Sequence, residues 1–279
     1  MSNSAIILSI CSEALAGNSG KDWWEKKVDQ VKNADRPAVF YLAFSSAPRK
    51  VSKSALQLSE QQVAALKAIN PAFNLATWTI DELCRIGLMT ALPIRKNQEI
   101  LDKLFSTADM RESVALYKGL IYLDNASSFV IRAIDGLRTN IQHVFDAIAL
   151  DNIFPSKYFE EAPWNQMVLK ALFMDRPIYR IHHLDERRNA TLATILHDYA
   201  HERWSAHRKV SPELWRGVVG FVDGAIADDL KKVITEGDKI EVAAAKRVIL
   251  ESGLTSDFDV GDILEVLPTW DEIGAQLTS

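Results

Sequence analysis

Hydrophobic residues recur with the period of an α-helix along the whole chain, and signals for β-strands are nearly absent. No Asn-Gly or Asp-Gly turn joins two segments of alternating polarity, and β-branched residues rarely cluster. A chain without strand signals has to bury its apolar stripes helix against helix. We therefore predict an all-α fold.

Frequent helix start signals divide this pattern into short elements. Thr79 to Glu82 and Asp109 to Glu112 have the pattern of capping boxes, and Ser211 precedes a proline suited to the first helical position. The predicted helices span residues 3–16, 20–33, 36–46, 55–68, 79–92, 97–106, 109–123, 127–136, 140–150, 163–174, 189–207, 212–220, 225–235, 238–252 and a weaker 260–266.

Short connections between these helices favour antiparallel hairpins, stacked as a bundle or as an irregular HEAT-like solenoid. No fixed-period repeat supports a regular solenoid. Residues 47–54 and 174–188 are the clearest irregular connections. We expect a single domain over residues 1–279 with an acidic tail from about residue 254. That tail either stays loose or docks through Ile263, Leu264, Val266, Leu267 and Trp270.

Composition excludes several classes of protein. The net charge is −5 and no Lys/Arg-rich run occurs, so nucleic-acid binding is not expected. Cys11 and Cys84 have no Cys or His companion, which suits reduced thiols in a cytoplasmic protein. The N-terminus lacks the basic region of a signal peptide, and no segment is apolar enough for a transmembrane span. No GxSxG, P-loop, GxGxxG or DDxxD pattern indicates a known catalytic class.

Between Arg138 and Arg216, amides, cations and aromatic residues occupy helical faces that are otherwise apolar. Buried polar groups need partners, because an unpaired buried amide costs about 1–3 kcal/mol and a lone charge costs more. This density indicates a binding site within a helical scaffold. The candidate ligand-binding residues are Lys118, Arg138, Asn140, Trp164, Asn165, Gln166, Lys170, Tyr199, Arg203 and Trp204.

Three predicted helices carry most of these residues, and each allows two interpretations. Lys118 lies on a polar stripe that is either a solvated edge or the wall of a cleft. Asn165 lies between apolar neighbours, where its amide either bonds a neighbouring helix end or faces a ligand. Arg203 lies in the middle of an apolar face, so it requires either a carboxylate from a neighbouring helix or an anionic ligand.

The opposite face of the helix at 189–207 carries His197 and His201, one turn apart, which is the spacing of a two-histidine metal site. The zincin pattern is not met, because Asp198 rather than Glu follows the first histidine. Glu202 is one candidate third ligand, and further candidates are His182, His183 and Glu186. The alternative is that both histidines simply belong to a polar surface.

Several strings in the C-terminal half resemble the EboA-domain family. They are RTN at 138–140, VFDAIAL at 144–150, FP at 154–155, WNQMVLKALF at 164–173, DYAHERW at 198–204 and PELWR at 212–216. The resemblance is densest over 138–216 and diffuse in the N-terminal half, around residues 115–117. It implies a bacterial cytoplasmic protein of secondary-metabolite pathways and carries over no catalytic residue.

Three functions are therefore open. The first is a non-catalytic or accessory protein that binds a polar or anionic small molecule in secondary-metabolite biosynthesis and precursor trafficking. The second is a metal-assisted enzyme of the same pathway that uses His197 and His201. The third is a helical scaffold that binds other proteins of the same gene cluster. The sequence identifies no cofactor.

Overall fold

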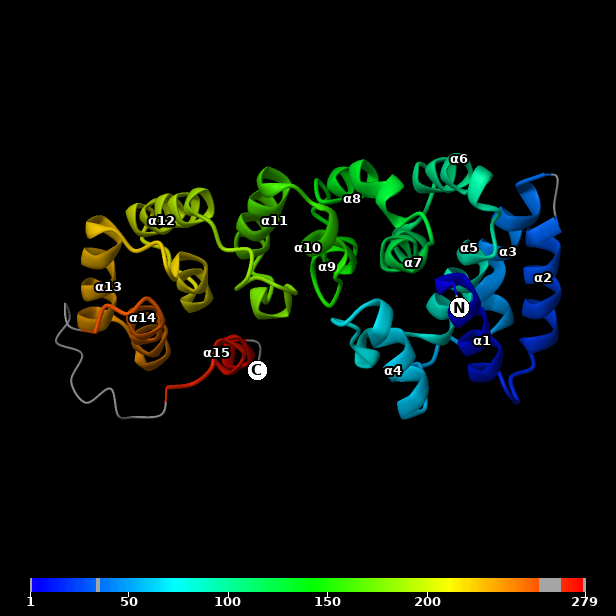
Figure 1. Ribbon diagram of the computed structural model, residues 1–279, viewed down its shortest axis with the longest axis horizontal. Helices are drawn as coiled ribbons and strands as arrows, with labels where there is room; N and C mark the ends of the chain where they lie inside the picture. Colours follow the sequence, from blue (N-terminus) through cyan, green and yellow to red (C-terminus); the bar gives the residue numbers. More distant parts are fainter. Residues whose placement is uncertain (1, 34–35, 256–266, 278–279) are drawn as a thin grey trace. The chain divides into compact units, whose positions relative to one another are not determined.

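The computed structural model describes residues 2–33, 36–255 and 267–277. The chain forms two compact units, Met1–Phe159 and Glu160–Ser279, which are taken separately below (Figure 1). The boundary falls inside the segment that was predicted to carry the binding site. The organisation as one domain therefore stays a prediction.

Every regular element in the described residues is a helix, so the predicted all-α class is confirmed. The extended pairing among these residues is limited to an isolated bridge between Ala55 and Thr79. The HEAT-like stacking remains a prediction. Within the described residues, none of the helices combines the length and apolar character needed to cross a bilayer.

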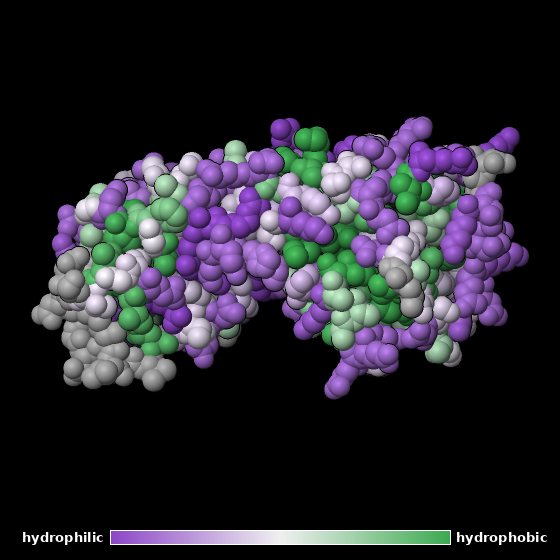
Figure 2. Space-filling model, in the orientation of Figure 1, coloured by the Kyte–Doolittle hydropathy of each residue, from purple (hydrophilic) through white to green (hydrophobic). Residues whose placement is uncertain are grey.

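Unit 1 is built from ten α-helices with short 3-10 turns between them in the part of the chain that is described. They are α1 (Asn3–Ala14), α2 (Lys21–Asn33), α3 (Ala38–Lys50), α4 (Glu60–Ile69), α5 (Ile80–Thr90), α6 (Ile94–Phe105), α7 (Met110–Gly119), α8 (Val130–Gly136), α9 (Gln142–Ala149) and α10 (Phe154–Tyr158). Helix α5 is buried along most of its length and packs against α1, α2, α3 and α7. By contrast, α2 buries Trp24, Val28 and Val31, and Figure 2 shows its outward side covered with hydrophilic residues.

The predicted capping boxes are confirmed at the starts of α5 and α7. Glu82 Oε2 accepts from the backbone N–H of Thr79 at 3.2 Å. At α7 both halves are present, because Asp109 Oδ1 accepts from Glu112 N at 2.8 Å and Glu112 Oε2 accepts from Asp109 N at 3.2 Å. These bonds satisfy backbone donors that have no partner inside a helix.

The segment 47–54, which we expected to be irregular, is helical as far as Lys50, even though Pro48 lies inside α3. Proline lacks the N–H that would bond the carbonyl four residues earlier, which belongs to Phe44. Here Arg85 Nε, from α5, donates to that carbonyl at 3.1 Å. A side chain distant in sequence thus replaces the missing backbone bond, and the helix continues.

Unit 2 contains α11 (Glu161–Phe173), α12 (Ala190–Ser205), α13 (Gly224–Glu236), α14 (Lys239–Glu251) and α15 (Trp270–Leu277). The predicted helix 212–220 is instead a 3-10 helix, η5 (Pro212–Val218), which packs between α12 and α14. η5 and α12 approach closely at Gly217, where an added Cβ would lie 2.3 Å from Leu196 Cδ1 and the leucine side chain would have to move. Segment 174–188 was predicted to be irregular, and its helical structure is limited to one short 3-10 turn, η4 (Ile178–Arg180).

Two helices were not predicted, α10 and α15. The tail docks through Trp270, which is buried, donates from Nε1 to Glu251 Oε2 at 3.1 Å and lies under the Arg247 guanidinium. Leu267 is half-buried. Ile263, Leu264 and Val266, together with the weaker predicted helix 260–266, lie outside the described residues.

Candidate functional site

Helix α12 presents two chemically different faces within unit 2. Tyr199 and Arg203 are one turn apart on one side, and His197 and His201 are one turn apart on the other. The first pair lines a pocket, called here the Arg203 pocket. The second pair belongs to a group of metal-binding side chains, called here the histidine cluster.

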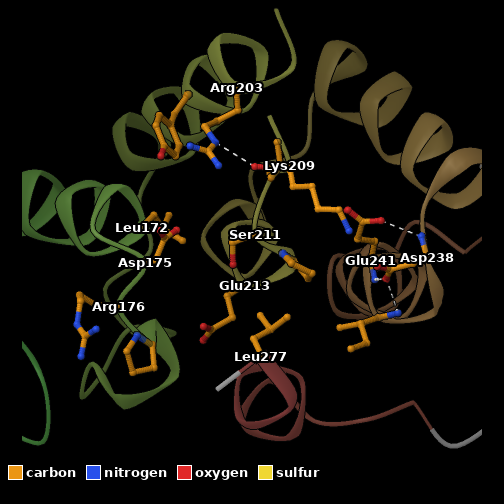
Figure 3. A pocket seen from close by; sticks show the side chains of 15 residues that line it. Leu172, Asp175, Arg176, Arg203, Lys209, Ser211, Glu213, Asp238, Glu241 and Leu277 are labelled. Atoms are coloured by element: carbon orange, nitrogen blue, oxygen red, sulfur yellow. Dashed lines mark hydrogen bonds between the residues drawn. The ribbon is translucent and has the colours of Figure 1, made fainter. Parts of the chain in front are cut away.

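The Arg203 pocket has a volume of about 370 Å³. Residues from α11, α12, η5, α14 and α15 line it, with the segments that follow α11 and α12 (Figure 3). The apolar part of its wall is formed by Leu172, Pro177, Val210, Pro212, Ile240 and Leu277. The polar part is formed by Asp175, Arg176, Tyr199, Arg203, Lys209, Ser211, Glu213, Asp238 and Glu241.

The end of α12 holds Arg203 in place. After Ser205 the chain reverses through His207, at φ 53°, and the backbone N–H of Arg208 bonds the carbonyl of Arg203 at 2.9 Å. This left-handed helix ending brings the next residues back over the last turn. Arg203 Nε then donates to the carbonyl of Lys209 at 2.9 Å (Figure 3).

Arg203 has no ion pair with a carboxylate among the described residues. Its side-chain partners there are the Lys209 carbonyl and the hydroxyl of Tyr199. A guanidinium has five N–H donors, so these two contacts do not use its full capacity. Of the two interpretations open from the sequence, pairing with a neighbouring carboxylate is therefore not seen in the described part of the chain.

Glu213 lies at the pocket wall on η5 and is 3% exposed. Burial raises the pKa of Glu213 to about 7, although the Tyr179 backbone N–H and the charge of Arg216 oppose the rise. That N–H donates to Glu213 Oε1 at 2.6 Å. The carboxyl group therefore exchanges its proton near neutral pH, and the pocket's charge changes with it.

The histidine cluster joins α12 to α13. Asp229 Oδ2 lies 2.8 Å from His197 Nε2 and 2.7 Å from His201 Nε2. The carboxylate that faces both histidines is thus Asp229, which lies on a neighbouring helix. Glu202, the sequence candidate for this place, is exposed. The stacked pair His182 and His183 lies in the segment before α12.

Three of the ten predicted ligand-binding residues belong to unit 1. Lys118 Nζ donates to the Thr77 carbonyl at 2.6 Å and to Glu82 Oε2 at 2.9 Å. Arg138 is exposed and lies 3.6 Å from Asp135. Asn140 is also exposed. Lys118 therefore makes its hydrogen bonds within its own unit. These surroundings are neither a solvated edge nor the wall of a described pocket, the two interpretations made from the sequence.

Four more predicted residues belong to α11. Asn165 is buried and exchanges two hydrogen bonds with Asn189, at 3.0 and 2.9 Å. Because Asn189 also caps α12, this pair matches the helix-end alternative proposed for Asn165. Trp164 is fully buried beneath the Arg187 guanidinium. Gln166 is exposed and Lys170 is half-buried, and neither lines the Arg203 pocket.

The remaining three predicted residues lie on α12. Tyr199 and Arg203 line the same pocket. Trp204 lies at the other side, where its ring contacts His201 and Trp215 and supports Lys232 Nζ at 4.5 Å. The structure thus brings together one pair of the predicted set at a pocket, rather than all ten residues.

Sequence reasoning missed Arg176, Lys209, Glu213 and Asp229. A usable signal existed for Glu213, because it follows a proline in the mostly apolar stretch PELWRGVVG, where Arg216 is the other charged residue. Asp229 carried a weaker signal, since it lies on the apolar side of the predicted helix 225–235. Arg176 and Lys209 lie in connections, where the side-chain direction does not follow from periodicity.

One comparison with known proteins gives a result. The family model of the metabolite traffic protein EboA matches residues 6–219. No curated protein and no solved structure matches the chain. The match includes Tyr199, Arg203 and Glu213 but ends before Asp229. Since it covers most of the sequence, the chain belongs to the EboA family.

Proposed function

We propose that this protein binds a polar or anionic small metabolite in the Arg203 pocket and acts as a non-catalytic carrier or accessory protein in secondary-metabolite precursor traffic. The family's description as a metabolite traffic protein supports the general kind of function. The observation that carries the proposal is Arg203, a guanidinium at a pocket wall that is not paired with a carboxylate among the described residues.

The charges of the pocket favour a ligand with a negatively charged end. The Lys209 carbonyl orients Arg203 through Nε, and the Tyr199 hydroxyl takes part of its remaining donor capacity. The other terminal N–H groups could clamp a carboxylate or phosphate. Lys209 and Arg176 add positive charge to the same wall. A ligand anion bound there gains charge-assisted hydrogen bonds, each contributing about 1.5–3 kcal/mol.

The acidic side of the pocket sets a second requirement. Asp175, Asp238 and Glu241 line it together with Glu213. Asp238 and Glu241 already accept backbone N–H groups in the capping box of α14, so ligand hydroxyl or amino groups would meet mainly Asp175 and Glu213. A purely anionic compound would face repulsion from all four carboxyl groups when they are ionised. The neutral form of Glu213 can itself donate one hydrogen bond. The mixed lining therefore supports a polar ligand with both an anionic end and donors.

The pocket volume and apolar lining are those of a small-molecule site, which is usually apolar with a few orienting polar groups. Prenyl diphosphates and aromatic acids are two classes that combine an anionic end with an apolar body. Tyr199 and Leu277 would contact that body.

Thermal-shift measurements with geranyl diphosphate and 4-hydroxybenzoate test the proposal. A ligand at 100 times its Kd stabilises a protein by about 2.7 kcal/mol, which gives a readily measured rise in Tm. Arg203→Ala should reduce the rise strongly, because a 10- to 100-fold weaker affinity leaves only about 0.4–1.4 kcal/mol of stabilisation. Arg138→Ala, which removes an exposed arginine in unit 1, is the matched control and should keep it. An equal rise in the Arg203 variant would remove this residue from the site.

A further inference from the structure

The histidine cluster combines three ligand atoms from two helices, on the face of α12 opposite the Arg203 pocket. His197 Nε2, His201 Nε2 and a carboxylate oxygen of Asp229 all lie within 4.8 Å of one another. Two imidazoles and one carboxylate are the donor set of many catalytic zinc sites and of non-haem iron sites. The cluster does not depend on the proposed function, because it shares no lining residue with the Arg203 pocket.

Hydrogen bonding explains only part of this geometry. His201 Nε2 is hydrogen-bonded to Asp229 Oδ2 at 2.7 Å. His197 Nε2 is 2.8 Å from the same oxygen, yet this atom is buried and makes no hydrogen bond in the described part of the chain. A ring N–H or lone pair is fixed in the imidazole plane. The plane of His197 therefore points beside the Asp229 oxygen rather than at it.

A shared cation requires that kind of misalignment. Around one metal ion the lone pairs of the ligands converge on the ion and not on one another. At metal–ligand distances of about 2.0–2.2 Å, neighbouring ligand atoms of a tetrahedral site are roughly 3.3–3.6 Å apart. The observed separations are 2.7 and 2.8 Å, so binding would require the Asp229 oxygen to move outward by about 0.5–0.9 Å from both nitrogens.

The surroundings leave room for further ligands. The His201 side chain is 55% exposed, whereas those of His197 and Asp229 are 18% and 12% exposed. Water can therefore complete the coordination on the outer side. Trp204 stands against the edge of His201, with ring centroids 5.5 Å apart, and forms an apolar wall on one side. Lys232 lies over that tryptophan, and Asp228 is paired with Lys231 at 2.9 Å.

We propose that His197, His201 and Asp229 bind one divalent transition-metal ion, such as Zn²⁺, with water in the remaining positions. The nitrogen donors favour this class of ion over Mg²⁺ and Ca²⁺, which prefer oxygen ligands. Asp229 lies beyond the part of the chain that the family model matches, so the third ligand comes from outside that part.

Calorimetric titration of the untagged, chelator-treated full chain with Zn²⁺ tests this site. The wild type should bind one equivalent. His201→Gln and Asp229→Asn should each weaken Zn²⁺ binding at least about tenfold, because each removes a direct metal ligand. Losing only a residue that hydrogen-bonds a ligand already lowers metal affinity by about 10–100-fold. His201→Gln is the safer variant for folding, since its side chain is the most exposed of the three.

His143→Gln is the matched control, because His143 is exposed on α9 in unit 1 and should leave Zn²⁺ binding unchanged. Titration with Co²⁺ adds a spectroscopic readout: ligation by the cluster gives a visible absorption band that both cluster variants lose. Unchanged Zn²⁺ affinity in His201→Gln and Asp229→Asn would overturn the proposal. Absence of Zn²⁺ binding by the wild type would do the same.

Discussion

The two units use inward-facing cations in opposite ways. In unit 1, Arg85 donates to the Phe44 carbonyl of α3 and lies 3.8 Å from Asp81 of its own helix. Lys118 donates to the Thr77 carbonyl and to Glu82 of α5. In unit 2, Arg203 lines a pocket and bonds only a carbonyl and a tyrosine hydroxyl among the described residues. Packed cations thus support the fold in unit 1, whereas the half-buried Arg203 of unit 2 is the group we propose for ligand binding. Position on a helical face alone does not separate these two roles.

Unit 2 also contains satisfied charges, which makes the contrast with Arg203 sharper. Arg216 is buried and donates to both oxygens of Asp185, at 2.6 and 2.8 Å, and to Asp271 at 3.2 Å. Arg188 pairs with Asp185 as well. These contacts tie η5 to the segment before α12 and to α15. Arg203 lacks such a network in the part of the chain that the structure describes.

Arg85→Met should give the largest loss of stability. The substitution leaves the Phe44 carbonyl without its donor and the nearby Asp81, which lies 3.8 Å from Arg85, without a counter-charge. Breaking a buried pair in this way costs about 3–5 kcal/mol. Urea unfolding measures this loss in the free energy of unfolding.

The double variant Arg85→Met, Pro48→Ala should recover about 1 kcal/mol of the loss, because residue 48 then offers an N–H to the Phe44 carbonyl. No recovery would mean that Arg85 does not compensate for the proline.

Glu213 should make the stability of unit 2 depend on pH. Its pKa in the fold is about 7, above the ordinary value of 4.5. The protonated form therefore favours folding, and this contribution is fully present below about pH 4.5 and is lost as pH rises through 7. The difference amounts to at most about 3 kcal/mol.

The matched variant for this effect is Glu213→Gln, which keeps an acceptor for the Tyr179 N–H but cannot ionise. Urea unfolding at pH 5 and pH 8 should show a smaller drop in the free energy of unfolding for the variant than for the wild type. Equal drops would show that Glu213 does not titrate in this range.

Lys118→Met should cost less than Arg85→Met, about 2 kcal/mol, because Lys118 and Glu82 keep 14% and 16% of their side-chain surface exposed and water partly compensates. The methionine keeps an unbranched apolar stem but removes the ammonium group, with its contact over Trp78 and both of its hydrogen bonds. The thermal shift caused by a ligand should be unchanged. A lost shift would connect unit 1 to the binding site and break the contrast between the units.

Much of the fold could be predicted from periodicity and capping signals. The starts of α5 and α7 followed from residues three positions apart, which interact locally. The helical conformation of residues 47–50 could not be predicted in this way, because it depends on Arg85, which is far away in sequence. The 3-10 geometry of η5 could not be predicted either, in a segment that packs closely on α12 at Gly217 and Leu196.

The candidate site was predicted less well than the fold. The spacing of Tyr199 and Arg203 places both on one helical face, and both line one pocket. The same reasoning could not show that the Asn165 amide is hydrogen-bonded to Asn189, or that Asp229 faces the two histidines. Those facts depend on which helices pack together, and single-helix periodicity contains no information about that.

The most direct test measures unfolding free energy and ligand affinity on the same preparation of Arg203→Ala, using whichever of geranyl diphosphate and 4-hydroxybenzoate stabilises the wild type. We predict that stability changes by less than about 1 kcal/mol, because no buried carboxylate is left uncompensated. Affinity should fall by roughly 10- to 100-fold. A loss of unfolding free energy as large as that of Arg85→Met, with ligand affinity unchanged, would contradict the proposal that Arg203 binds the ligand.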